Sequence, residues 1–254
     1  MQLPQFQVHA AIEETHWWFR ARRRIVQGLI HELLPPNTGK KIVDVGCGTG
    51  GMTAYLSDEY GVTGIDPAPE AIAFARKRFP KCTFIQGYAP GSVQKECSDA
   101  DMILLLEVLE HVEHDRDFVQ SLIATLKPGG YLMIFAPADM SLWGPHDKGF
   151  EHFRRYDSVG EFRRTWTEAP VKEVLVSHCN TRLYPVAKAA RILARLKGSA
   201  WGPGDTDLAT PPAPLNAMLE RIFRGELRRL KKAMRGQAAP FSHGVSLMAI
   251  LRKM

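Results

Sequence analysis

The sequence predicts an α/β fold built on a doubly wound sheet of seven strands, and two observations support that prediction. Between residues 40 and 138, short apolar segments alternate with segments of helical pattern, which is the order expected of repeated strand–helix units in a parallel sheet. The segment ADMILLLE, residues 100–107, is continuously apolar in its centre, as is typical of a strand covered on both faces.

The elements up to residue 138 follow from these patterns in chain order. A helix is expected over residues 13–34, because Pro35 and Pro36 cannot continue it. Strands are expected at residues 40–46, 60–66, 82–87, 100–107 and 131–138. Helices are expected at residues 70–79 and 115–126.

After residue 138 the alternation is less regular. A loop over residues 146–157 leads into a helix at 158–166, and the last two strands are expected at 172–178 and 244–253. Roughly 60 residues between those strands are too many for a hairpin loop. They contain helical patterns at 184–197 and 215–235, and a Pro/Gly-rich linker at 201–214 separates these two.

The chain therefore divides into a helical cap (1–36), an α/β core (37–179 with 241–254) and a helical insertion (180–240) that serves as a lid or an interface. From residue 180 onward there are fourteen Lys or Arg and four Asp or Glu, so the net charge of this part is +10. Because the net charge of the whole chain is +6, the part before residue 180 has a net charge of −4. The pattern at 215–235 combines an apolar stripe with a basic back. It predicts a cap packed on the sheet or, alternatively, a peripheral membrane face for a lipid-linked acceptor.

The composition excludes several classes of protein. The apolar content of 45% is enough for a packed core, and no apolar run approaches the roughly 18 residues that would cross a membrane. The N-terminus has no pattern of a secretory signal. The four cysteines are scattered without metal or disulfide spacing, which favours a reduced, cytoplasmic protein. The oligomeric state is not readable from these features.

A glycine-rich turn follows the first strand, in the sequence VDVGCGTGG. Gly46, Gly48 and Gly50 permit a tight turn and close approach of a ligand to the backbone. Asp66 follows 20 residues after Gly46, at the position of an acid that binds ribose hydroxyls. The spacing also fits a dinucleotide, and hence an NAD(P)-dependent dehydrogenase. Asp44 disfavours it, because its charge would repel a pyrophosphate and attract the ammonium of S-adenosylmethionine.

With these motifs in view, the chain resembles the class I S-adenosylmethionine-dependent methyltransferases, which have a Rossmann-like fold. VDVGCGTG, GIDPAPEAIAFARKR, DMILLLEVLEHV and LKPGGYLMIFAPA occur in that family's order. The resemblance implies seven strands with the last one antiparallel. It also implies cofactor contacts from Asp44, Gly46, Cys47, Gly48, Thr49, Gly50, Asp66, Pro67, Gly87, Tyr88 and Glu107, although Tyr88 stands where the family often has an acid. The flanks HWWFRARRR and HDKGFEHFRRYD resemble bacterial small-molecule methyltransferases.

Glu107-x-x-Glu110-His111 resembles the metal motif of ubiquinone-pathway O-methyltransferases and of small-RNA 2′-O-methyltransferases. Together with His152, the motif could hold Mg²⁺, Mn²⁺, Fe²⁺ or Zn²⁺ beside the methyl-transfer site. The alternative is that Glu107 contacts the cofactor while Glu110 and His111 stabilise the loop. His146 or His152 would then be the general base.

The loop after the fifth strand is the expected acceptor side. Trp143 and Tyr156 would suit a flat or apolar body, and Arg154 would suit an acidic group. Arg155 is expected to pin the loop to nearby acids such as Asp157 and Glu161. Trp18 is a further candidate for acceptor binding, and it belongs to an aromatic segment that forms either core or a lid over the cofactor.

The sequence thus predicts methyl transfer from S-adenosylmethionine to a small molecule, with oxygen favoured as the acceptor atom. A dehydrogenase and a non-catalytic, methyltransferase-like partner subunit are the alternatives. Nucleic acid is disfavoured as the acceptor, because the Asn/Asp-Pro-Pro-Tyr loop of base-amino methyltransferases is absent.

Overall fold

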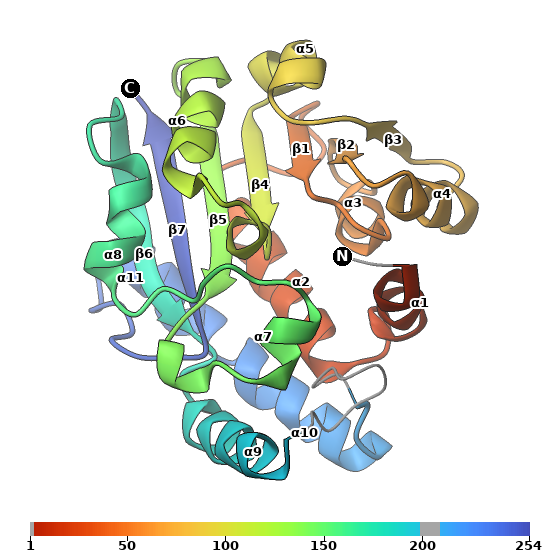
Figure 1. The fold of residues 1–254 in the computed structure, drawn as a ribbon. Helices are drawn as coiled ribbons and strands as arrows, with labels where there is room; N and C mark the ends of the chain where they lie inside the picture. The colour runs from red at the N-terminus through yellow and green to blue at the C-terminus, as the bar shows by residue number, and fades with distance from the viewer. Residues whose placement is uncertain (1–2, 199–208) are drawn as a thin grey trace.

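The computed structural model describes residues 3–198 and 209–254, and its centre is a seven-stranded sheet of order β3-β2-β1-β4-β5-β7-β6 (Figure 1). All neighbouring strands pair in parallel except that β7 is antiparallel to both β5 and β6. The expected fold class is confirmed, including the antiparallel last strand. The strands are β1 (Lys41–Val45), β2 (Gly61–Asp66), β3 (Thr83–Gln86), β4 (Met102–Leu106), β5 (Tyr131–Pro137), β6 (Val171–Cys179) and β7 (Ser246–Lys253).

The strand order positions the site. The chain moves outward from β1 through β2 to β3, then returns to place β4 on the other side of β1. Loops leaving β1 and β4 therefore diverge, and in open parallel sheets such a point opens a crevice beyond the carboxyl ends of the strands. Every residue of β4 is buried, which explains why its sequence is an unbroken apolar run.

Helices cover both faces of the sheet and its carboxyl edge. One apolar cluster joins the sheet to Ile25 and Leu29 of α2, Phe223 of α10 and Leu230 of α11. A second cluster joins the opposite face to α5, α6 and α8. The helices are α1 (Leu3–Ile12), α2 (Trp17–Ile30), α3 (Gly51–Leu56), α4 (Pro69–Arg78), α5 (Gln94–Asp99), α6 (Asp115–Thr125), α7 (Pro145–Gly149), α8 (Val159–Arg163), α9 (Tyr184–Lys197), α10 (Ala213–Arg224) and α11 (Leu227–Met234).

The N-terminal helix differs from the expectation of one helix starting at residue 13. Two helices form instead, because His16 has an extended backbone and its Nδ1 accepts a hydrogen bond from the Trp18 amide at 3.3 Å. Such a side-chain cap starts a new helix. The additional helix α1 lies at the right-hand side of the molecule in Figure 1, close to α4.

The helix expected at 215–235 is also divided in two. Glu226 is fully buried, and its Oε1 accepts the Arg182 amide at 2.9 Å, so the chain breaks there between α10 and α11. Phe223 and Leu230 are buried in the core, which bears out a cap packed on the sheet. Residues 201–208 of the expected linker lie outside the described residues, and 209–212 precede α10 without regular structure. No helix in the described ranges combines the length and apolarity needed to span a membrane.

Candidate active site

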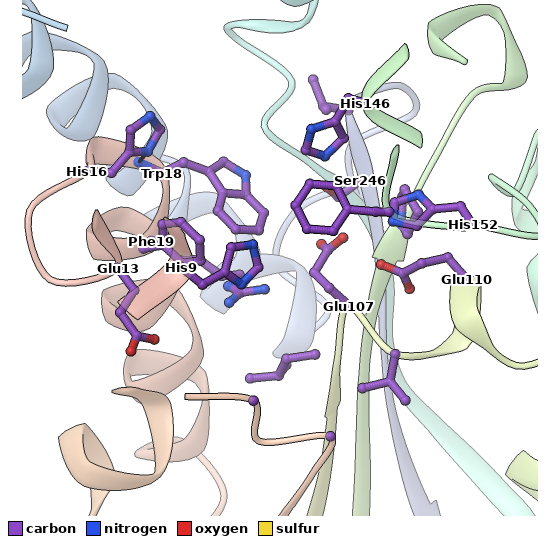
Figure 2. A pocket seen from close by; sticks show the side chains of 18 of the residues that line it. His9, Glu13, His16, Trp18, Phe19, Glu107, Glu110, His146, His152 and Ser246 are labelled. Carbon is purple, nitrogen blue, oxygen red and sulfur yellow. Dashed lines mark hydrogen bonds between the residues drawn. The ribbon is translucent and has the colours of Figure 1, made fainter. Parts of the chain in front are cut away.

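A cavity of about 610 Å³ opens at the carboxyl ends of β1, β2 and β4. The glycine-rich turn and the segment after β4 form one wall. The opposite wall comes from α1 and α2, and α7, α9 and α10 contribute further lining residues. Figure 2 shows the two walls facing each other, with Trp18 and Phe19 on one side and Glu107, Glu110 and His152 on the other.

The glycine-rich turn has the backbone that its composition predicts. Gly46, Gly48 and Gly50 all have positive φ, at 72°, 53° and 86°. A Cβ on Gly46 would lie 2.5 Å from Cγ2 of Val108, whereas a Cβ on Gly48 would meet nothing within 4 Å. Gly46 therefore allows the turn to approach the segment after β4, and Gly48 leaves open space on the cavity side.

Two buried aspartates flank this turn and line the cavity. The Asp66 carboxylate accepts the Gly48 amide at 3.0 Å and the Ala68 amide at 2.9 Å, so it fixes the turn to β2. Asp44 accepts the Thr53 hydroxyl at 2.7 Å, and burial raises the pKa of Asp44 to about 6. A cation in the cavity would hold Asp44 in its ionised form.

The remaining residues expected around the cofactor divide into two groups. Cys47, Thr49 and Pro67 line the cavity beside Asp44 and Asp66. Gly87 and Tyr88 do not, because the loop after β3 directs Tyr88 outward, where 73% of its surface is exposed.

The segment after β4 carries carboxylates into the cavity. Glu107 has a φ of 61°, and its amide donates to the Phe135 carbonyl at 2.8 Å. A 3₁₀ turn, Leu109–His111, follows directly and buries Glu110. Oε1 of Glu107 and both carboxylate oxygens of Glu110 are buried without a hydrogen-bond partner in the described structure. Burial, together with the Glu107 charge, raises the pKa of Glu110.

Two imidazoles join Glu110. One ligand atom from each of Glu110, His111 and His152 lies within 4.8 Å of the others. The His111 and His152 rings meet edge to face, with centroids 4.7 Å apart. Burial lowers the pKa of His111 to about 3, so this ring is neutral and can offer a nitrogen lone pair. Of the expected metal set, the structure thus gathers Glu110, His111 and His152, with the Glu107 carboxylate beside them (Figure 2).

His146 also lines the cavity, on α7. Its ring centroid is 4.6 Å from that of Phe150 and 6.1 Å from that of His152. Burial and the charge of Arg191 hold the pKa of His146 well below its ordinary value. His146 is therefore a neutral base next to the group formed by Glu110, His111 and His152.

A fully buried carboxylate, Asp147, orients His152. It interacts with His152 Nδ1 at 3.2 Å, Arg155 Nη1 at 2.6 Å and Arg191 Nη1 at 2.7 Å. Burial alone would raise its pKa, but the His152 contact and the two guanidiniums hold the pKa of Asp147 well below its usual range. An Nδ1–H donated to Asp147 leaves the Nε2 lone pair of His152 for a ligand or a proton.

Three residues expected to bind the acceptor lie away from the cavity. Tyr156 is in the core, and its hydroxyl donates to Asp115 at 2.6 Å. Arg154 forms an ion pair with the same carboxylate at 2.6 Å. Trp143 is also absent from the cavity wall. Tyr156 and Arg154 hold the loop against α6, because Asp115, the half-buried first residue of that helix, accepts from both.

Arg155 does pin the loop as expected, but its acid is Asp147 and neither Asp157 nor Glu161. Its Nε donates to the Ala138 carbonyl at 2.9 Å. Asp147 precedes Arg155 by eight positions whereas Asp157 follows it by two, so sequence proximity was a poor guide to the partner.

The N-terminal helices form one wall of the cavity. Trp18 and Phe19 line the cavity, while Trp17 packs on Phe223 with ring centroids 6.3 Å apart. Glu13 accepts the Thr49 hydroxyl at 2.7 Å and pairs with Arg78. This wall is thereby fastened to the glycine-rich turn.

Arg22 is a site residue that the sequence pattern did not single out. Its guanidinium lies 4.3 Å from the Trp18 ring centroid, and its Nε and Nη1 are buried without a hydrogen-bond acceptor in the described structure. Burial lowers the pKa of Arg22, and the charges of Glu107 and Asp44 oppose that shift. The signal was the four-residue spacing of Trp18 and Arg22, which places a cation over an aromatic ring on one helix face.

A family model described as a methyltransferase domain matches residues 18–175, more than half of the 254-residue chain. The mitochondrial ubiquinone biosynthesis O-methyltransferase of Schizosaccharomyces pombe is 39% identical over 104 residues, 38% of each chain. The ubiquinone biosynthesis O-methyltransferase of Methylocella silvestris is 32% identical over 165 residues, 57% of this chain and 63% of that protein. The chain thus spans 38 to 63% of the lengths of these relatives.

Solved structures show the same fold at low sequence identity. The plantazolicin methyltransferase BamL, in complex with a triazolic desmethylPZN analogue and SAH, has a TM-score of 0.59 at 16% identity, covering 98% of this chain and 90% of that one. A TehB-like SAM-dependent methyltransferase from Corynebacterium glutamicum has a TM-score of 0.51 at 17% identity, covering 92% and 88%.

The family match favours methyl transfer over the dehydrogenase and the non-catalytic subunit. The strand order of the sheet and the backbone of the glycine-rich turn agree with this family match. The chain belongs to the methyltransferase-domain family, with the fold of the class I S-adenosylmethionine-dependent enzymes.

Proposed function

We propose that this protein transfers the sulfonium methyl of S-adenosylmethionine to a hydroxyl oxygen of a small molecule, with help from a divalent metal. The observation that carries the proposal is a group of buried, unpartnered carboxylate oxygens, one from Glu107 and two from Glu110, beside two histidines on the cavity wall. Buried polar groups in native proteins have partners, so three orphaned carboxylate oxygens indicate a missing cation.

The cofactor fits the part of the cavity near the glycine-rich turn. Asp44 is placed to attract the ammonium of the methionine part, and Asp66 stands at the end of β2 where ribose hydroxyls are bound in this fold. We assign the methionine carboxylate to Arg22, because its buried Nε and Nη1 need an acceptor. A carboxylate there would form a charge-assisted pair.

The proposed metal ligands are Glu107, Glu110, His111 and His152. Carboxylates alone would suit Mg²⁺, and the two imidazoles extend the choice to Mn²⁺, Fe²⁺ and Zn²⁺. A bound divalent ion would lower the pKa of a coordinated acceptor hydroxyl and so favour its alkoxide near neutral pH. Asp147 contributes by fixing the ring of His152, as the partners of metal-binding histidines do.

The chain's own residues then handle the acceptor and the proton. His146 is neutral, lines the cavity and lies next to His152, so it takes the proton of the acceptor hydroxyl. The acceptor oxygen forms the new bond to the methyl carbon, and the carbon–sulfur bond breaks to give S-adenosylhomocysteine. Trp18 and Phe19, on the facing wall, exclude water from this transfer (Figure 2).

Elemental analysis and chelation test the metal. The protein purified without chelator should contain a divalent metal in stoichiometric amount, and dialysis against EDTA should remove both the metal and the methyl transfer. The acceptor can be sought by incubating labelled S-adenosylmethionine with a metabolite extract. Full activity after exhaustive EDTA, with no metal detected, would leave His146 or His152 as a metal-free general base and refute the metal part of the proposal.

In this proposal, the state of the cysteines indicates the cellular compartment of the reaction. Cys47, Cys82, Cys97 and Cys179 are all free, which suits a reducing environment. We therefore place the reaction in the cytoplasm.

A further inference from the structure

Helix α9 buries one small residue and exposes most of its large apolar ones. Ala194 is fully buried, whereas Leu193 and Leu196 are 53% and 80% exposed. Val186 and Ile192 are exposed on the same arc of the helix. Helices on the surface of a protein normally turn their large apolar side chains toward the core, so α9 has the opposite arrangement.

Helix α10 shows a related pattern on its outer side. Leu215 and Met218 are exposed, although Phe223 of the same helix is fully buried. Leu219, one position after Met218, lines the cavity. The exposed pair is therefore on the flank of α10 next to the cavity.

These residues surround the cavity on the acceptor side. Val186, Ala187 and Ala190 of α9 line the cavity together with Leu219 of α10. Figure 1 shows α9 and α10 at the lower end of the molecule, beyond the carboxyl ends of the parallel strands. We define the α9–α10 rim as Val186, Ile192, Leu193, Leu196, Leu215 and Met218.

Among the described residues around the rim, basic side chains outnumber acidic ones, and Glu220 of α10 is paired with Arg20. Helix α9 contains four cations and no acid. Arg191 pairs with Asp147 and Lys188 with Asp139, while Arg195 and Lys197 lie in the exposed last turn. A groove beside α10 is lined by Arg182, Arg221, Arg224, Arg228, Arg229 and Lys232. Among the described residues, the side chains of Arg221, Arg224 and Arg228 form no ion pair. An anionic partner would complement this surface.

We propose that the α9–α10 rim docks on an anionic lipid bilayer and that the acceptor enters the cavity from that bilayer. The apolar rim residues would lie among the lipid chains, and the cations beside them would meet phosphate headgroups, as in interfacial helices. This inference rests on the proposed function and adds the location of the acceptor. A second copy of the chain fits less well, because a two-fold interface would bring the same cations face to face.

Vesicle co-sedimentation tests the docking. The full-length protein should bind vesicles of phosphatidylglycerol mixed with phosphatidylcholine, and pure phosphatidylcholine should bind much less. The double variant Leu193→Ser/Leu196→Ser should lower the partition coefficient by at least about tenfold, since two exposed leucines lose their burial in lipid. Arg195→Glu should weaken binding to the anionic vesicles by about fivefold or more. Met254→Ser is the matched control, because Met254 is 70% exposed at the opposite end of the molecule.

Two further measurements keep this test separate from the proposed function. Binding of S-adenosylhomocysteine by calorimetry should be unchanged in the leucine double variant, since neither leucine lines the cavity. Analytical ultracentrifugation without vesicles measures self-association. Equal binding of wild type and double variant to anionic vesicles would overturn the docking proposal. So would a wild-type dimer that dissociates in the double variant while neither protein binds vesicles.

Discussion

Replacing Glu110 with glutamine should stabilise the metal-free protein while it abolishes metal binding. Both oxygens of the Glu110 carboxylate are buried and unpartnered, and the Glu107 charge lies close by. An unsatisfied buried polar group costs about 1–3 kcal/mol, and more when it is charged. Glutamine keeps the shape and removes the charge, so we expect Glu110→Gln to raise the free energy of unfolding by about 1–2 kcal/mol at pH 8 in EDTA.

The pH dependence has a defined sign. Because burial raises the folded-state pKa of Glu110 above its unfolded value, the folded protein retains a proton that the unfolded chain has already lost. The stability of the metal-free wild type therefore falls as pH rises from the unfolded pKa, about 4.5, through the raised pKa. Glu110→Gln removes this contribution, so its advantage should be small at pH 4.5 and larger at pH 8.

Urea unfolding measures both effects. Wild type and Glu110→Gln are compared in EDTA at pH 5 and pH 8, and again at pH 8 with saturating Mn²⁺ or Zn²⁺. A metal at 100 times its dissociation constant should stabilise wild type by about 2.7 kcal/mol and leave the variant unchanged. If Glu110→Gln is less stable than wild type in EDTA at pH 8, the carboxylate has a partner within the protein and the reasoning fails.

Substitutions at four other residues test the roles assigned above. Arg22→Met should weaken binding of S-adenosylhomocysteine by at least about tenfold while Arg22→Lys weakens it less; equal affinities in calorimetry would remove Arg22 from the cofactor site. Asp147→Asn should lower the free energy of unfolding by about 3 kcal/mol, because two buried guanidiniums lose their acid, and should reduce metal affinity by about 10- to 100-fold. His146→Ala should reduce the methyl-transfer rate without releasing the metal, whereas His152→Ala should release it; the reverse pattern in elemental analysis would exchange their roles.

The sheet could be predicted from the sequence because its signals are local. A short, continuous apolar run such as Met102–Leu106 predicts a buried strand from its own residues. The repeated glycines predict a turn with positive φ, which the structure shows. Element boundaries were less predictable where a tertiary contact decided them. The break between α10 and α11 depends on the Glu226 carboxylate reaching the Arg182 amide, 44 positions away in the chain.

The residues of the cavity differ in how well the sequence predicted their positions. Glu110, His111 and His152 could be named because a compact motif and a strand end placed them at the edge of the sheet. Tyr156 and Arg154 could not be separated from acceptor-binding residues, since only the folded loop shows that Asp115 receives both. Arg22 could not be distinguished by sequence from the arginines that follow it. Its burial depends on where α2 lies over the cavity.

Isothermal titration calorimetry with S-adenosylhomocysteine, and in parallel with NADH, tests the central claim most directly. The account predicts that S-adenosylhomocysteine binds the wild-type protein and that Asp66→Ala lowers its affinity strongly, because the Asp66 carboxylate both fixes the glycine-rich turn and faces the cavity. It predicts no measurable binding of NADH. Tight binding of NADH without affinity for S-adenosylhomocysteine would contradict the account.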